Sequence, residues 1–170
     1  VSLTIIDDDG GSDTAEVFTH VNNVAPTVTL DPVVAIDEDG TASLTVTIAD
    51  PGTLDTFTLN IDWGDPLSPP NTETYTYAAS GTGTQTFTLT HQYLDDNPTA
   101  TASDGYTISI TVTDDDTDSD TATTDVTVNN VAPAVAAGGD QTGITEGALV
   151  TITPTFIDPG ALDTHTATVD

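Results

Sequence analysis

The densest group of chemically active side chains in this sequence is the acidic run at residues 114–120, which reads DDDTDSD. Five carboxylates stand within seven residues, and the 170-residue chain holds 28 Asp and Glu but no Lys or Arg. Two unit charges 4 Å apart repel by about 1 kcal/mol even in bulk water. Because no Lys or Arg can neutralise the run, we expect it to take up a metal cation or to have raised pKa values.

Calcium is the cation that this composition favours, because Ca²⁺ takes about 6–8 oxygen ligands from carboxylates, amides and backbone carbonyls. The acids at alternate positions of the run look like the start of an EF-hand loop. The Gly at loop position 6 and the Glu at position 12 are missing, so we reject an EF-hand. A solvated acidic surface without an ordered ion is the main alternative, and other cations are a third.

Two segments of the sequence occur twice at nearly the same spacing. Residues 7–26 recur at 114–133, an offset of 107 residues, with 13 of 20 positions identical, and DPGTLDT at 50–56 returns as DPGALDT at 158–164. A period of this length is a whole domain. The sequence therefore predicts a window on a longer tandem array: the end of one repeat (1–23), a complete repeat (24–131) and the start of a third (132–170).

The complete repeat reads as a series of short strands separated by turn signals such as DEDG, DPG and SDG. Apolar residues alternate with Thr and Ser, which is typical of half-buried strands. We expect seven strands, at residues 27–35, 42–49, 56–63, 72–79, 84–93, 106–113 and 121–128. Seven short antiparallel strands in a repeat of this length predict an all-β, immunoglobulin-like sandwich.

Three stretches carry a family resemblance: NIDWGD at 60–65, HQYLDDN at 91–97 and YTISITVTDDD at 106–116. Together they resemble the PKD-type repeat, which implies tandem immunoglobulin-like sandwiches. The VNNVAP linker and the DDDGGSD loop look like those of large bacterial surface and adhesin proteins, which implies a secreted or cell-surface location. Pro66 stands where the family commonly has Gly after WGD, so the turn there is less well predicted.

The antiparallel order of the strands predicts that the acids gather at two ends of the repeat. One end would combine the 50–55 loop, the 114–120 loop and the preceding linker. The other would combine the 37–39 turn, the 95–97 loop and the start of the next repeat. Gly11 replaces Asp118 in the earlier copy, so Asp118 is left out. The predicted ligands are Asn22, Asn23, Asp50, Asp55, Asp114, Asp115, Asp116 and Asp120 at the first end, and Asp37, Glu38, Asp39, Asp95, Asp96, Asn129, Asn130, Asp158 and Asp163 at the second.

Composition also argues against several classes of function. The chain has no Cys, so disulfides and thiol chemistry are absent. Its net charge of -28 repels nucleic acids and anionic membranes, and no apolar run is long enough for a transmembrane helix. Acids confined to repeated turns do not indicate a catalytic pair, so we expect no enzyme. The three histidines are expected on surfaces or strand faces, and Trp63 in the core.

These observations predict a structural role. We expect a spacer repeat of a long extracellular protein, an adhesin stalk or surface filament, made rigid by Ca²⁺ at the junctions between repeats. Its partners would be neighbouring repeats of the same chain or other copies in a filament. The alternative is a glycan- or protein-binding module, for which Tyr75 and Tyr77 are the candidate aromatic residues on one strand face.

Overall fold

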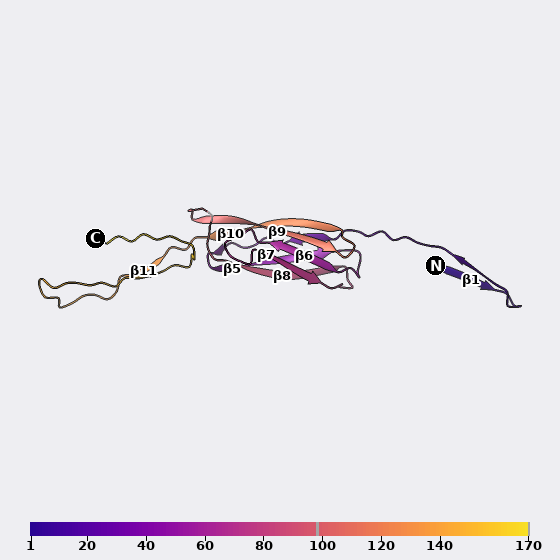
Figure 1. Cartoon of the computed structure of the whole chain (residues 1–170), viewed down its shortest axis with the longest axis horizontal. Helices are drawn as coiled ribbons and strands as arrows, with labels where there is room; N and C mark the ends of the chain where they lie inside the picture. Colours follow the sequence, from indigo (N-terminus) through magenta and orange to yellow (C-terminus); the bar gives the residue numbers. More distant parts are fainter. Residues whose placement is uncertain (98, 170) are drawn as a thin grey trace.

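The computed structural model describes residues 1–97 and 99–169, and every regular element in that part of the chain is a β-strand. A central unit, residues 24–131, holds two sheets (Figure 1). An N-terminal hairpin and a C-terminal segment project from its opposite ends. No helix suited to crossing a membrane occurs among the described residues.

The larger sheet of the central unit has five strands and the smaller has three. The larger runs in the order β4 (Ile36–Asp37), β10 (Ser119–Asn129), β9 (Ser103–Asp114), β6 (Phe57–Asp62) and β7 (Thr72–Tyr77). The smaller runs β3 (Thr27–Leu30), β5 (Gly40–Ala49) and β8 (Thr84–Tyr93). All neighbouring strands are antiparallel except β4 and β10, which pair in parallel. The arrangement is consistent with a β-sandwich.

The core is built by the alternation seen in the sequence. Along β9 the side chains of Tyr106, Ile108, Ile110 and Val112 are buried, and the residues between them face outward or are only partly covered. They belong to one apolar cluster with buried residues of β5 and β8, so the two sheets face each other across it. Burying a large apolar side chain stabilises a fold by about 1.5–3 kcal/mol. Every buried member of the cluster lies between residues 28 and 128, so the central unit has a complete core of its own.

The first predicted strand is only partly correct. Residues 27–35 were expected to be continuous, but β3 ends at Leu30 and the chain reappears as β4 in the other sheet. Pro32 explains the break, because proline has no N–H to donate to a strand ladder. Beyond it, Val128 pairs with Ile36 and Asn129 with Asp37. The other six predicted strands are confirmed, although β9 begins at Ser103 rather than at 106 and β10 extends to Asn129.

The flanking segments reproduce strand pairings of the central unit. In the hairpin of β1 (Ser2–Ile6) and β2 (Ser12–Glu16), Ile6 pairs with Ser12, just as Thr113 pairs with Ser119 one repeat offset later. At the other end, β11 (Ala134–Ala136) and β12 (Thr155–Ile157) repeat the register of β3 and β5. The repeated sequence therefore folds locally in the same way, even though both flanking pairs are exposed.

Candidate metal centres

Within the described residues, three groups of side chains bring three possible metal ligands within 4.8 Å of one another. The first is Asp50, Asp55 and Asp114, which we call the Asp114 end of the central unit. The second is Glu38, Asp95 and Asp96, which we call the Glu38 end. The third is Asp158, Asp163 and His165, in the segment that follows the central unit.

The Asp114 end is formed where β5 and β9 finish. Asp50 follows β5 and Asp114 is the last residue of β9, and both side chains are buried. Asp50 accepts a hydrogen bond from the Gly52 amide at 2.6 Å through Oδ1, while its buried Oδ2 has no partner. Burial raises the pKa of Asp55, and the charges of Asp50 and the neighbouring run of acids raise it further. The group thus concentrates negative charge that no described cation offsets.

The linker before the central unit is attached to this end. Asn23 donates from Nδ2 to Asp114 at 2.8 Å and to Asp118 at 3.0 Å. Asp118 also closes the loop, because its amide donates to Asp114 Oδ1 at 2.9 Å. Asp118 is not one of the predicted ligands; it lies outside the ligand group but helps to hold Asn23 against Asp114.

The remaining residues predicted for this end lie outside the group. Asp115 accepts from the Thr56 amide at 3.0 Å, and Asp120 accepts from the Val28 amide at 2.9 Å. These two acids therefore anchor neighbouring strands through backbone donors. Asp116 and Asn22 are exposed.

The Glu38 end lies beyond β4 and β8. Glu38, Asp95 and Asp96 are each less than 5% exposed, with values of 3%, 3% and 4%. Glu38 accepts from the Val131 amide at 2.7 Å through Oε1, but its Oε2 is buried without a partner. Asp96 Oδ2 is also buried without a partner. Such an oxygen is costly unless a donor or a cation satisfies it.

The pKa values of Glu38 and Asp96 are both raised, which shows that their negative charge is poorly compensated at the Glu38 end. Burial raises the pKa of Glu38 most, and Asp163, Asp96 and Asp95 raise it further, against the opposing hydrogen bond from Val131. Burial and the adjacent Asp95 likewise raise the pKa of Asp96. A bound cation would reverse both effects, so the residues at this end fit a hard cation held by oxygen ligands.

Six other residues predicted for the second end are not in the group, and two of them, Asp158 and Asp163, belong to the third group. Asp37 accepts from Asn129 Nδ2 at 3.3 Å, and Asp39 accepts from Gln92 Nε2 at 2.8 Å. The amide of Asn130 donates to the Ala102 carbonyl at 3.2 Å. These contacts shape the turn and the linker around the buried carboxylates.

The loop at residues 158–164, which we call the docking loop, packs onto the Glu38 end. The Ala161 amide donates to the Leu94 carbonyl at 3.1 Å, and the Leu162 amide donates to Asp95 Oδ2 at 2.7 Å. Gly160 leaves room for two carboxylates, because a Cβ there would lie 2.7 Å from Glu38 Oε2 and 2.8 Å from Asp163 Oδ2. The loop therefore carries the carboxylate of Asp163 to that of Glu38.

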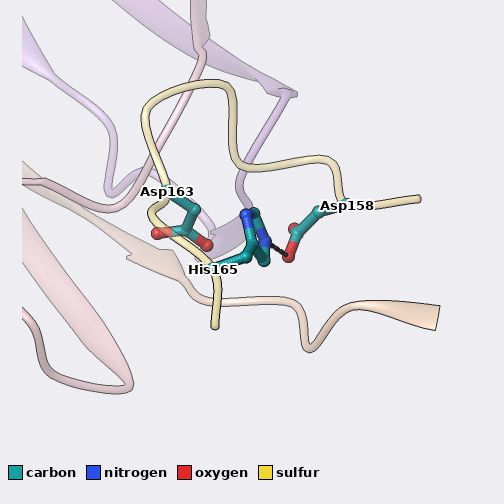
Figure 2. A group of neighbouring side chains, drawn as sticks. All are labelled: Asp158, Asp163 and His165. Carbon is teal, nitrogen blue, oxygen red and sulfur yellow. Dashed lines mark hydrogen bonds and ion pairs between the residues drawn. The ribbon is translucent and has the colours of Figure 1, made fainter. Parts of the chain in front are cut away.

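The third group contains His165, which is not among the predicted ligands and directly follows the docking loop. Figure 2 shows Asp158, Asp163 and His165 gathered on the docking loop, with His165 Nε2 2.7 Å from Asp158 Oδ2. This hydrogen bond lowers the pKa of Asp158. The expectation that the histidines lie on surfaces or strand faces holds for His91, which is on the inward face of β8 and 5% exposed. A histidine on an alternating strand faces inward or outward by register alone, which composition cannot reveal.

The aromatic residues of the two sheets of the central unit pack in or against the core. Trp63 is fully buried, as predicted, and its ring stacks on His91 with centroids 5.1 Å apart. Its Nε1 donates to Glu73 at 3.0 Å. Tyr77 is only partly exposed and its ring stacks against Phe87. Neither Trp63 nor Tyr77 presents a free ring face for a sugar.

No protein-family model matches the chain, and no curated protein matches it.

Proposed function

We propose that this chain is a spacer segment of a long extracellular protein, an adhesin stalk or surface filament, in which Ca²⁺ holds consecutive PKD-like, immunoglobulin-like units in line. Its work is mechanical, because the cation fixes the angle between one unit and the next. The resemblance of the NIDWGD, HQYLDDN and YTISITVTDDD stretches to PKD-type repeats supports the extracellular setting.

One observation carries the proposal: buried, unpartnered carboxylate oxygens lie at the contact between two segments of the chain. Glu38 Oε2 and Asp96 Oδ2 have no hydrogen-bond partner, and the docking loop adds Asp163 beside Glu38. The sequence has no Lys or Arg, so neither carboxylate can be neutralised by one of these cationic side chains. A bound metal ion is the remaining strong counter-charge, and it would join the two segments.

Calcium fits this donor set better than the other common cations. The donors are carboxylate oxygens, with backbone carbonyls and Asn side chains close by. Ca²⁺ tolerates irregular arrangements of about 6–8 such oxygens, whereas Mg²⁺ demands a near-ideal octahedron and Zn²⁺ favours nitrogen and sulfur. Extracellular Ca²⁺ modules bind in a range of about 10⁻⁴–10⁻³ M, so millimolar Ca²⁺ is the relevant condition.

Removal of the cation tests the proposal directly. In 2 mM CaCl₂ we expect a higher Tm than in EDTA, together with a narrower distribution of solution shapes by small-angle X-ray scattering. NaCl at matched ionic strength is the control, since simple screening acts on the whole acidic surface. A melting curve that is the same in CaCl₂, in EDTA and in matched NaCl would overturn the proposal.

The competing function, a glycan- or protein-binding module, has weaker support. It needs exposed aromatic faces or a hollow lined by them, and the rings of Trp63 and Tyr77 are packed against other side chains. Catalysis has no support from the acid groups either, because each sits in turns that close the ends of the strands.

A further inference from the structure

The loop at residues 50–56, which we call the Asp50 loop, is a near copy of the docking loop. The two read DPGTLDT and DPGALDT. Their turns are also alike: Asp50 accepts from the Gly52 amide at 2.6 Å, and Asp158 from the Gly160 amide at 3.1 Å. In each turn the second Asp donates its amide back to the glycine carbonyl, at 3.2 Å and 3.3 Å. The two loops thus present equivalent surfaces.

Only one of the two copies is docked. The amides of Ala161 and Leu162 donate to Leu94 and Asp95, whereas the equivalent amides of Thr53 and Leu54 donate to no residue of the described chain. Docking also covers the leucine, because Leu162 is 45% exposed and Leu54 is 82% exposed. The Asp50 loop therefore has the docking surface without its partner.

The linker shows the same difference between its two copies. Val131, in the second VNNVAP, donates its amide to Glu38 Oε1 at 2.7 Å. The equivalent amide, that of Val24, donates to no described residue. Asp50 Oδ2, a buried carboxylate oxygen with no partner, lies at the same end of the unit, where Asn23 attaches the linker. The two free amides of the Asp50 loop thus match the donors that the docking loop presents to the Glu38 end.

We propose that the Asp114 end of this chain is a docking surface for the Glu38 end of a second unit of the same kind, with a divalent cation between them. The partner would supply the acceptors that the Glu38 end supplies to the docking loop here: the Leu94 carbonyl to Thr53 and Asp95 Oδ2 to Leu54. This inference rests on the cation of the proposed function, and adds a defined head-to-tail contact.

Residues 1–131 test this contact, because they contain the whole core and both ends but lack the docking loop. In 5 mM CaCl₂ we expect the weight-average mass of residues 1–131, measured by sedimentation, to rise at least two-fold between micromolar and millimolar protein. EDTA should return it to monomer. The full chain should stay monomeric in CaCl₂, because its own docking loop covers its Glu38 end.

Two substitutions in residues 1–131 identify the surface. Leu54→Asp adds a charge to the exposed tip of the Asp50 loop and should abolish the association. In this variant, the amide resonances of residues 53 and 54 should no longer shift at the protein concentrations where the parent protein associates in Ca²⁺. Thr88→Asp, which adds the same charge at an exposed position in the middle of β8, should leave it intact. The inference would be overturned if residues 1–131 stayed monomeric at millimolar concentration. It would also be overturned if the Leu54→Asp variant still associated.

The outcomes separate this inference from the proposed function. If Ca²⁺ raises the Tm of the full chain but residues 1–131 do not associate, the docking surface is refuted and the proposed function stands. If Ca²⁺ changes neither quantity, both fail. Equal association of the full chain and of residues 1–131 would also refute the inference, since the covered Glu38 end should block it.

Discussion

At the scale of single residues, the most informative group is the bare carboxylate of Glu38. One of its oxygens is held by the Val131 amide and the other is buried without a partner. A glutamine would keep the first contact and remove the unpaired charge. Replacing Glu38 by glutamine therefore separates two contributions of a ligand carboxylate. One is the free energy that its desolvation costs when no metal is bound, and the other is the free energy that it contributes to metal binding.

We expect Glu38→Gln to raise the Tm in EDTA and to reduce the rise in Tm that CaCl₂ produces. An unsatisfied buried group usually costs about 1–3 kcal/mol, so we expect the free energy of unfolding in EDTA to rise by about 1 kcal/mol. In a domain of this size that corresponds to a rise in Tm of about 4–8 °C. Calorimetry of both proteins in EDTA and in CaCl₂ measures both effects. Asp31→Asn is the matched control, because Asp31 is exposed and outside every ligand group, and should change neither value. An unchanged Ca²⁺ response in Glu38→Gln would remove Glu38 from the ligand set.

The sequence reveals the types of these residues but not their neighbours. Asp50, Asp55 and Asp114 could be grouped from the expected strand order, as could Glu38 with Asp95 and Asp96. Their sequence context does not distinguish them from Asp37, Asp39 or Asp115, whose carboxylates instead accept hydrogen bonds from other groups of the chain. Which acid is buried and bare depends on side-chain direction within a turn, and that is set by contacts between segments far apart in sequence.

At the scale of elements, the turn after β6 explains why the WGD stretch contains glycine. Gly64 has a φ of 73°, and a Cβ there would lie 2.5 Å from the backbone carbonyl of Thr107 on β9. The Gly64 amide donates to Asp62 Oδ1 at 2.9 Å, and the Asp65 amide donates to Asn71 Oδ1 at 2.6 Å. The turn thus closes tightly with Pro66 in place, a detail that the family resemblance left open.

Gly64→Ala should destabilise the protein far more than Gly81→Ala. Both glycines have a positive φ, of 73° and 71°, so each alanine would carry a left-handed penalty of roughly 1–2 kcal/mol. Only at Gly64 must a neighbouring strand also shift, because Gly81 has open space around it. Urea unfolding of the two variants compares them directly. If both variants lost the same free energy of unfolding, the close contact between residue 64 and the Thr107 carbonyl would not contribute to the destabilisation.

The strands themselves were largely predictable, because strict alternation of Thr with apolar residues matches the two-residue period of a half-buried β-strand and not the period of a helix. The exception was the region around Pro32. A pattern of apolar residues continues through Val33, Val34 and Ala35, so the sequence suggested one long strand. The missing N–H of proline and the parallel partner offered by β10 decided otherwise, and neither is visible in residue alternation.

At the scale of the whole molecule, the dominant quantity is the net charge of -28. The acids whose pKa is raised hold protons in the folded state that they lose in the unfolded state. For Glu38 this window lies above its usual value of 4.5, and for Asp55 and Asp96 above 3.8. By linkage, the free energy of unfolding falls as the pH rises through this window and recovers as the pH is lowered.

We therefore expect the Tm in EDTA, relative to that of Glu38→Gln, to be higher at pH 5 than at pH 7. Burial lowers the pKa of His91, which opposes this trend equally in both proteins, so the comparison isolates the carboxylate. In CaCl₂ the difference should shrink or reverse, because protons compete with the metal for the same carboxylates. Asp158 has the opposite sign: its lowered pKa gives stability that is lost only as the pH falls below its usual 3.8. Thermal melts at the two pH values, with and without Ca²⁺, measure this. A Tm difference between the parent protein and Glu38→Gln that is the same at pH 5 and at pH 7 in EDTA would contradict it.

The parallel pairing of β4 with β10 has a consequence for how the molecule would respond to being pulled. The linkers leave the central unit at opposite ends, so tension along the chain draws β4 and β10 past each other rather than peeling them apart (Figure 1). Their hydrogen bonds, including that from the Glu38 amide to the Asn129 carbonyl at 2.9 Å, would then bear the load together. Glu38 also sits at the proposed cation site, so a bound ion would strengthen this strand pair against tension.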